Sequence, residues 1–172
     1  MVELKTQNFE YNKEKYFGLK KQLKKLLGSN VKVDHVGSTA IPNMVGKNII
    51  DVLVAAKNEN EFQIFLEKIK GIGFFASLNS RSEIYQFFAS KETETGDGDT
   101  HIHLVIEATE RYKEFLWLRD YLLENPQEAE DYSNLKKHLI ESGITDRKQY
   151  RATKSEYVSA LIERAKKWHN AR

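Results

Sequence analysis

The sequence contains no cysteine among its 172 residues. This absence excludes a disulfide framework, a thiolate zinc site and a cysteine nucleophile. The sequence also lacks any apolar stretch near the roughly 20 residues that a membrane helix needs. The longest apolar run, residues 49–56, is interrupted by Asp51, and the first residues lack the basic start and apolar run of a signal peptide. We therefore expect a cytoplasmic protein without a membrane partner.

Neither sign of charge is in excess, because 27 basic side chains stand against 25 acidic ones and the formal net charge is +2. Domains that bind nucleic acid usually show a basic surface or stripe, so this balance argues against nucleic acid as a partner. A lysine-rich stretch at 13–25 and an acidic stretch at 92–99 are interpreted as a solvated helix face and a solvated loop. The length fits one domain spanning residues 1–172.

The first part of the chain alternates between helical and extended patterns. Apolar residues at helical spacing predict a helix over 12–27 that ends at Gly28. Strands are predicted over 31–36 and 49–56, with a loop over 37–48 between them. The second strand is apolar throughout except for Asp51, which is typical of a central strand buried on both faces. A further helix is predicted from a cap at Asn60 to Gly71, with Gln63 completing a capping box.

The second half moves from a period of two to a period of about 3.6. Strands are predicted over 74–77 and 83–90, joined by a turn at 79–82, and a mobile connection over 91–99 leads to a strand over 100–107. On that last strand, His101 and His103 face away from Ile102 and Leu104. Three helices are predicted next. The first covers 109–123, the second begins at a capping box formed by Asn125 and Glu128, and the third covers 146–169 with Tyr150 facing inward. The pattern indicates an α+β fold whose C-terminal third is helical.

One constellation suggests phosphate chemistry. The run His35-Val36-Gly37-Ser38-Thr39 follows a predicted strand, and Asp51 lies in the next one. A Gly-Ser step exposes backbone amides and a hydroxyl, which suits a phosphate group. A carboxylate on a buried strand is costly unless it is paired, hydrogen-bonded or bound to a cation, and Mg²⁺ prefers one or two such carboxylates with phosphates and water.

The same residues resemble a known family. The run from His35 to Pro42, then Gly46-Lys47 and Ile49-Ile50-Asp51-Val52-Leu53-Val54, is similar to the signature of the GrpB family. His101-Ile102-His103-Leu104 resembles the family's His-x-His strand. Later segments agree in order, around Phe115 to Leu122, Tyr132 with Leu135-Lys136, and Tyr150 with Lys154.

This resemblance implies a nucleotidyltransferase-like mixed β-sheet flanked by helices, with the Gly-Ser turn opening the site. In some bacteria the family's domain is joined to dephospho-coenzyme A kinase. The motif of active nucleotidyltransferases is a Gly-Ser step followed by Asp-x-Asp or Asp-x-Glu. In this similar sequence Leu53 occupies the position of the second acid. Two-metal chemistry needs shared carboxylates, so one carboxylate supports one ion, with Mg²⁺ on Asp51 as the expectation.

The candidate site residues follow from the pattern and the resemblance. Asp51 and His103 are the catalytic candidates, with Asp51 also the metal ligand. The candidates for binding a phosphate ligand are His35, Gly37, Ser38, Thr39, Lys47, His101, Arg119, Lys136 and Lys154. Each also has a structural interpretation: a tight turn at Gly37-Ser38, an internally satisfied Asp51, a polar sheet face at the histidines, and ordinary surface charges.

Three functions therefore stand open. The first is a nucleotide-binding or phosphate-binding protein of nucleotidyltransferase ancestry. The second is an active nucleotidyltransferase acting on a small molecule, protein or RNA, with Glu107, His101 or a group of the substrate replacing the missing acid. The third is a non-catalytic interaction module linked to coenzyme A metabolism, suggested by the aromatic-rich stretch from Tyr112 to Tyr121. The sequence identifies no protein partner.

Overall fold

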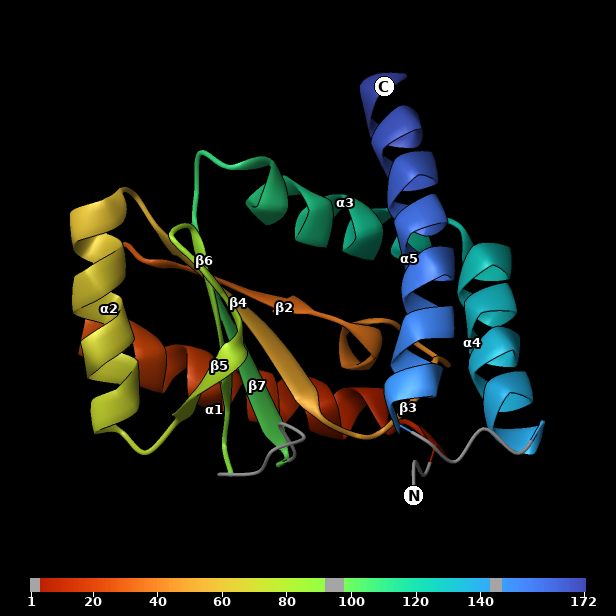
Figure 1. The fold of residues 1–172 in the computed structure, drawn as a ribbon, viewed down its shortest axis with the longest axis horizontal. Coiled ribbons are helices and arrows are strands. Elements are labelled where there is room, and N and C mark those ends of the chain that lie inside the picture. Colours follow the sequence, from red (N-terminus) through yellow and green to blue (C-terminus); the bar gives the residue numbers. More distant parts are fainter. Residues whose placement is uncertain (1–3, 92–97, 143–146) are drawn as a thin grey trace.

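A five-stranded mixed sheet forms the centre of the computed structural model, which describes residues 4–91, 98–142 and 147–172 (Figure 1). The strand order is β2-β4-β7-β6-β5. The β4–β7 pair is parallel and the other neighbours are antiparallel. The strand bounds are β2 Lys32–Val36, β4 Ile50–Ala56, β5 Phe75–Ser82, β6 Tyr85–Ala89 and β7 Thr100–Ile106.

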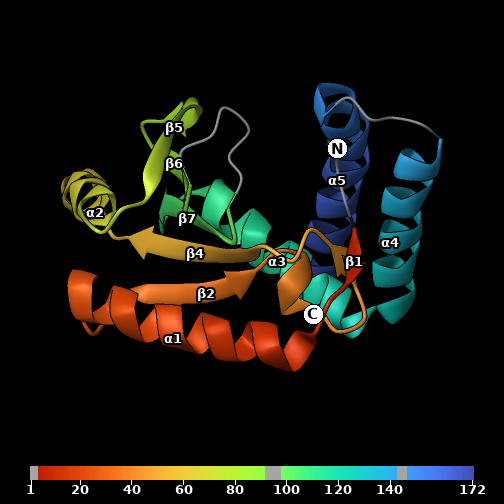
Figure 2. The same ribbon diagram turned by 90° about the horizontal axis from the view of Figure 1, so that it is seen from below.

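One face of the sheet carries the main hydrophobic core. Alternate side chains of β4 and β7, including Val52, Val54, Ile102 and Leu104, point into this core and are fully buried. Helices α1 (Phe9–Leu27) and α2 (Glu59–Gly71) cover it, and Figure 2 shows α1 lying alongside β2 and β4. The period-two alternation therefore places the intervening residues of β4 and β7 on the opposite face.

The opposite face is covered only in part. Helix α3 (Glu110–Glu124) packs there on Leu53, Ala55 and Val105. Helices α4 (Pro126–Glu141) and α5 (Arg147–Asn170) lie beside each other, set to one side of the sheet (Figure 1), and form a second core with the end of α3. The α+β class and the helical C-terminal third are confirmed. The part of the face that α3 leaves uncovered carries the ends of β4 and β7.

A small ribbon links the sheet to the helical region. Strand β1 (Lys5–Thr6) pairs antiparallel with β3 (Val45–Gly46). Strand β3 lies in the segment 37–48 that was predicted as a loop. Both strands have two residues, which is too short for a period to show in the sequence. A 3₁₀ helix over Ser38–Ala40 lies in the same segment.

Several predicted element ends are wrong, and local hydrogen bonds explain them. Helix α1 begins three residues earlier than predicted, because the Asn8 side chain caps it. Helix α2 is capped by Asn58 instead of Asn60, and the Glu61 carboxylate accepts at 2.6 Å from the amide of Lys57, one residue before the cap. Strand β5 continues through the predicted turn, and the chain reverses only after Ser82.

Another predicted cap is also wrong. Asn125 precedes α4 but makes no side-chain cap, and its amide donates to the Tyr121 carbonyl at 2.8 Å. Glu128 accepts instead from Tyr121 and Arg164. The predicted connection over 91–99 falls mainly on residues outside the described ranges, as does the side chain of Tyr150. None of the described helices is long and apolar enough to cross a membrane.

Candidate functional site

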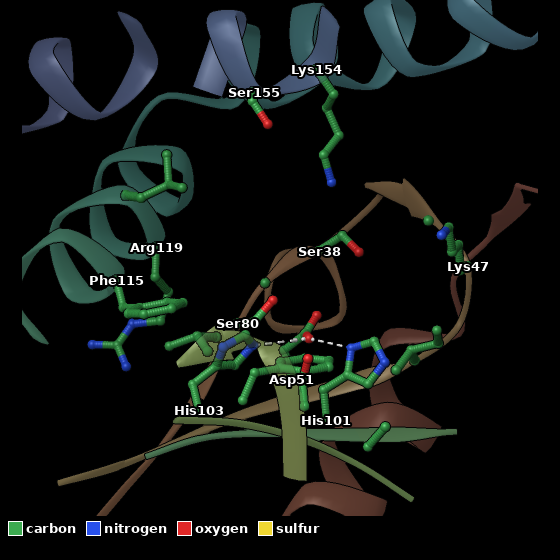
Figure 3. Close-up of a pocket in the computed structure, with 18 of the residues that line it drawn as sticks. Ser38, Lys47, Asp51, Ser80, His101, His103, Phe115, Arg119, Lys154 and Ser155 are labelled. Atoms are coloured by element: carbon green, nitrogen blue, oxygen red, sulfur yellow. Dashed lines mark hydrogen bonds and ion pairs between the residues drawn. The ribbon is translucent and has the colours of Figure 1, made fainter. Parts of the chain in front are cut away.

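A cleft of about 1110 Å³ opens over the uncovered end of β4 and β7 (Figure 3). Its floor carries Asp51, His101 and His103, and the Gly37-Ser38 turn forms one side. The helical region closes the opposite side, from which Lys154 and Ser155 of α5 project toward the floor. Residues from four separate parts of the chain, β4, β7, the Gly37-Ser38 turn and α5, therefore meet around one space.

Asp51 is held between two imidazoles. The register of the parallel strands places it opposite His101, with Leu53 opposite His103. Asp51 Oδ1 lies 3.1 Å from His101 Nδ1 and 3.3 Å from His103 Nε2. Burial disfavours the charged carboxylate, but these two hydrogen bonds outweigh it and hold the pKa of Asp51 well below its usual range. The carboxylate is thus an anion fixed by its neighbours.

Gly37 is the residue that lets the turn approach this carboxylate. Its φ is +72°, in the region that favours glycine, and a Cβ placed on it would lie 2.4 Å from Asp51 Oδ2. Gly46 shows a similar close approach, since a Cβ there would lie 2.4 Å from Ser38 Oγ and 2.0 Å from Gln7 Nε2. Both glycines therefore position Ser38 beside Asp51.

Aromatic side chains form a wall next to His103. The hydroxyl of Tyr85 lies 2.9 Å from His103 Nδ1, and burial raises the pKa of Tyr85 to about 12. Since His103 Nε2 contacts a carboxylate, Nε2 is the nitrogen that carries the proton, and the Tyr85 hydroxyl then donates to Nδ1. The rings of Phe87 and Phe115 lie 5.5 and 4.7 Å from the His103 ring.

The side chains that line the cleft carry far more positive than negative charge. Among the described lining residues Asp51 is the one carboxylate. Against it stand five basic side chains, Lys47, Lys91, Arg119, Lys136 and Lys154. Arg119 is partly engaged, because it donates to Asp120 at 2.7 Å and to Asp34 at 3.4 Å. A cleft with this balance attracts anionic ligands.

Nine of the eleven predicted site residues come together in the cleft, and two do not. His35 and Thr39 are absent from its described lining. The His35 ring stacks on Tyr16 at 4.7 Å, and its Nε2 lies 2.9 Å from Thr39 Oγ1. Burial lowers the pKa of His35 to about 4, so the ring is neutral near pH 7. These two residues support the turn from behind.

The GrpB protein family matches residues 1–164 of this chain. The chain belongs to the GrpB family.

Relatives and a solved structure extend over most of this GrpB-family chain. The glutamate-rich protein GrpB of Alkalihalophilus pseudofirmus is 31% identical over 149 residues, which cover 83% of this chain and 84% of the relative. UPF0157 protein YqkA of Bacillus subtilis is 30% identical over 89% of this chain, but the match spans only 44% of that protein. The crystal structure of conserved protein GrpB from Enterococcus faecalis has a TM-score of 0.79 at 25% identity, with 97% and 99% of the two chains covered.

A more distant similarity concerns the fold alone. The structure of Cid1 in complex with its short product ApU has a TM-score of 0.52 at 15% identity, over 77% of this chain and 42% of Cid1. The nucleotidyltransferase-like fold that the sequence resemblance implied is thereby confirmed.

The GrpB-family site does not fit the metal arrangement that this fold suggests. Leu53 is fully buried under α3, so the second strand position offers no ligand. Asp51 Oδ1 already contacts two imidazole nitrogens, and the two rings flank the carboxylate from opposite sides (Figure 3). Within residues 4–91, 98–142 and 147–172, no group of three His, Cys, Asp or Glu side chains is placed to hold a metal ion. Glu107 pairs with Lys32 at the far end of β7. Mg²⁺ on Asp51 therefore stays a prediction.

The sequence did not indicate two features of the cleft, the aromatic wall next to His103 and the position of Ser155. Tyr85 and Phe87 alternate along β6, so the sequence indicates that they share a face. It does not indicate that β6 pairs with β7, which places Phe87 opposite His103. Ser155 next to Lys154 carries no motif, and its place in the cleft follows from the packing of α5.

Proposed function

We propose that this protein binds a nucleotide or another phosphate-bearing ligand in the cleft over β4 and β7. The observation that carries the proposal is the composition of the lining, with five basic side chains around a single carboxylate. These side chains come from the segment after β3, the segment after β6, and helices α3, α4 and α5. Basic side chains that converge on one space with a single carboxylate create a positive potential there, and this potential favours an anionic ligand.

The Gly37-Ser38 turn is a second feature of the cleft that suits a phosphate. Ser38 begins a short 3₁₀ helix, so the amides that follow Gly37 stand at the edge of the cleft with the Ser38 hydroxyl. Backbone amides and a hydroxyl at a glycine turn suit phosphate oxygens. The Asp51 carboxylate repels a phosphate placed directly over it, so we place the phosphate on the Ser38 and Lys154 side.

The roles of Asp51 and His103 follow from their contacts. Asp51 orients both imidazoles, and His103 passes that orientation on to the Tyr85 hydroxyl. The proposal includes binding and does not extend to nucleotidyl transfer. The aromatic stretch of α3 offers little support for an interaction module, because Tyr112 and Tyr121 are buried and Phe115, Trp117 and Leu118 are half-buried.

The test is a thermal-shift screen of the purified chain against nucleotides, inorganic phosphate, and coenzyme A with its precursors. Each ligand is tested with and without Mg²⁺ or Mn²⁺. A ligand at about 100 times its Kd stabilises the folded protein by about 2.7 kcal/mol, which a melting curve resolves. A shift that depends on the metal would support Mg²⁺ on Asp51. Absence of any shift across the whole set would contradict the proposed function.

Replacing Lys154 with glutamine is expected to weaken binding of the best phosphate ligand about tenfold, which corresponds to about 1.4 kcal/mol. The reason is that Lys154 reaches into the cleft from α5 (Figure 3). Titration calorimetry measures the change. Lys167→Gln is the matched control, since Lys167 lies on the same helix but is exposed and outside the cleft. Equal affinities in the two variants would remove Lys154 from the site.

A further inference from the structure

Lys136 is a buried amine in the wall of the cleft. It lies on α4, is 4% exposed, and its Nζ donates to the Val45 carbonyl of β3. One turn earlier, Ser133 Oγ accepts from the Val45 amide at 3.3 Å. The Nζ also lies 4.6 Å from the centre of the Tyr132 ring. These contacts fix the amine at the junction of β3 and α4, where it faces the cleft.

The Val45 carbonyl and the Tyr132 ring favour the charged form of Lys136, but burial and the neighbouring Lys154 outweigh them. No described carboxylate forms an ion pair with it. Lys154 faces it from α5, and Tyr132 lies beneath it on α4. The other titratable or charged groups that share the cleft are Lys47, Tyr85, Lys91, Arg119 and the Asp51, His101 and His103 cluster. Burial, and then repulsion by Lys154, lower the pKa of Lys136 to about 7.

We propose that binding of a phosphate dianion in this cleft is accompanied by uptake of a proton on Lys136, so that Lys136 recognises dianionic phosphate. This inference rests on the proposed function. Without a ligand, an ammonium at Lys136 has no counter-charge among the described carboxylates, and it lies in a poorly solvated place next to Lys154. A dianion in the cleft supplies negative charge that stabilises this ammonium, and the proton comes from the solvent. The affinity for a ligand that is already fully ionised therefore falls as the pH rises above neutrality.

The number of protons taken up is measured by titration calorimetry with ATP and with inorganic phosphate at pH 8, in two buffers of different ionisation enthalpy. At this pH ATP is almost fully ionised and inorganic phosphate is mostly the dianion, so nearly all of the proton uptake is by the protein. If binding moves the pKa of Lys136 from about 7 to above 9, the chain takes up roughly 0.8 proton for each ligand bound. Lys136→Arg, which keeps its charge at every pH used, is expected to bind with no proton uptake.

Lys137→Arg provides the matched control, because Lys137 is the exposed neighbour on α4 and should leave the uptake at the wild-type value. Binding to the wild type without proton uptake would overturn the inference and leave the proposed function standing. Failure of ATP, phosphate and the screened ligands to bind at all would overturn both. Uptake that persists in Lys136→Arg would assign the proton to another group and also overturn the inference.

A ligand-free measurement tests the same amine. In the unfolded chain a lysine has a pKa of about 10.4, so between pH 7 and 10 the unfolded state binds more protons than the folded one. The denaturation midpoint of the wild type is therefore expected to rise, relative to that of Lys136→Met, as the pH increases from 7 to 9. Parallel pH profiles for the two proteins would show that Lys136 is charged before any ligand arrives, and would contradict the inference.

Discussion

Replacing Gly37 with alanine is expected to lower the free energy of unfolding by about 2–4 kcal/mol and to abolish ligand binding. The backbone at Gly37 has φ +72°, which an alanine adopts only with strain. Its Cβ would lie 2.4 Å from Asp51 Oδ2, and Asp51 cannot move away without breaking its contacts with both histidines. Urea denaturation measures the first effect and the thermal-shift screen measures the second.

Gly18→Ala is the control for this substitution. Gly18 lies inside α1, its φ is not in the positive range, and nothing lies within 4 Å of an added Cβ. Alanine at that position should stabilise the helix by about 0.5–1 kcal/mol and leave ligand binding unchanged. A Gly37→Ala protein as stable as the wild type would show that the turn relaxes freely, and the close approach to Asp51 would then have no structural role.

Replacing Asp51 with asparagine is expected to cost about 1.5–3 kcal/mol of stability at pH 7, because two hydrogen bonds to a charged acceptor are lost. The asparagine amide keeps one acceptor oxygen but turns a donor toward an imidazole. The Asp51 side chain is 23% exposed, so water replaces only part of this interaction. His103 also loses the partner that fixes its proton on Nε2. We therefore expect the response to phosphate ligands to weaken as well.

The dependence of this effect on pH gives an independent check. The pKa of Asp51 is lowered on folding, so its contribution is present above the unfolded-state pKa of about 3.9 and is lost as the pH falls below it. The difference between the wild type and Asp51→Asn should narrow between pH 4 and pH 2. Asp131→Asn, an exposed site on α4, should change stability by less than about 0.5 kcal/mol at either pH. If the stability difference between the wild type and Asp51→Asn stays constant with pH, the charge of Asp51 does not contribute and the loss of stability comes from the shape of the side chain alone.

The sequence predicts the central strands of this fold well because their periods are unambiguous. Residues 49–56 and 100–107 were predicted as strands, and β4 and β7 match them within a residue. Side-chain alternation also predicted that His101 and His103 share a face. The element ends were harder, since Asn58 and Asn60 are equally good caps by type, and only the completed helix distinguishes them.

The site could be predicted only as far as its local motif. Gly37, Ser38 and Asp51 follow from short-range spacing together with the family resemblance, and the structure brings them together. The contact between Asp51 and the histidines depends on strand register, which the sequence does not specify. The position of Lys136 depends on how α4 packs on β3. Its lowered pKa comes from that packing, so a lysine in a helical pattern looked the same as a surface charge.

The pairing of β4 with β7 also has a consequence for how this protein folds. The contacts of Asp51 with His101 and His103 join residues 50 and 52 positions apart in the chain. A loop of that size must close before either contact forms, and parallel pairing of this kind is slow compared with hairpins such as β5–β6. The cleft floor therefore does not exist in any partly folded state that contains only the local hairpins and helices. In newly made chains the cleft therefore forms late, when the two halves of the sheet join.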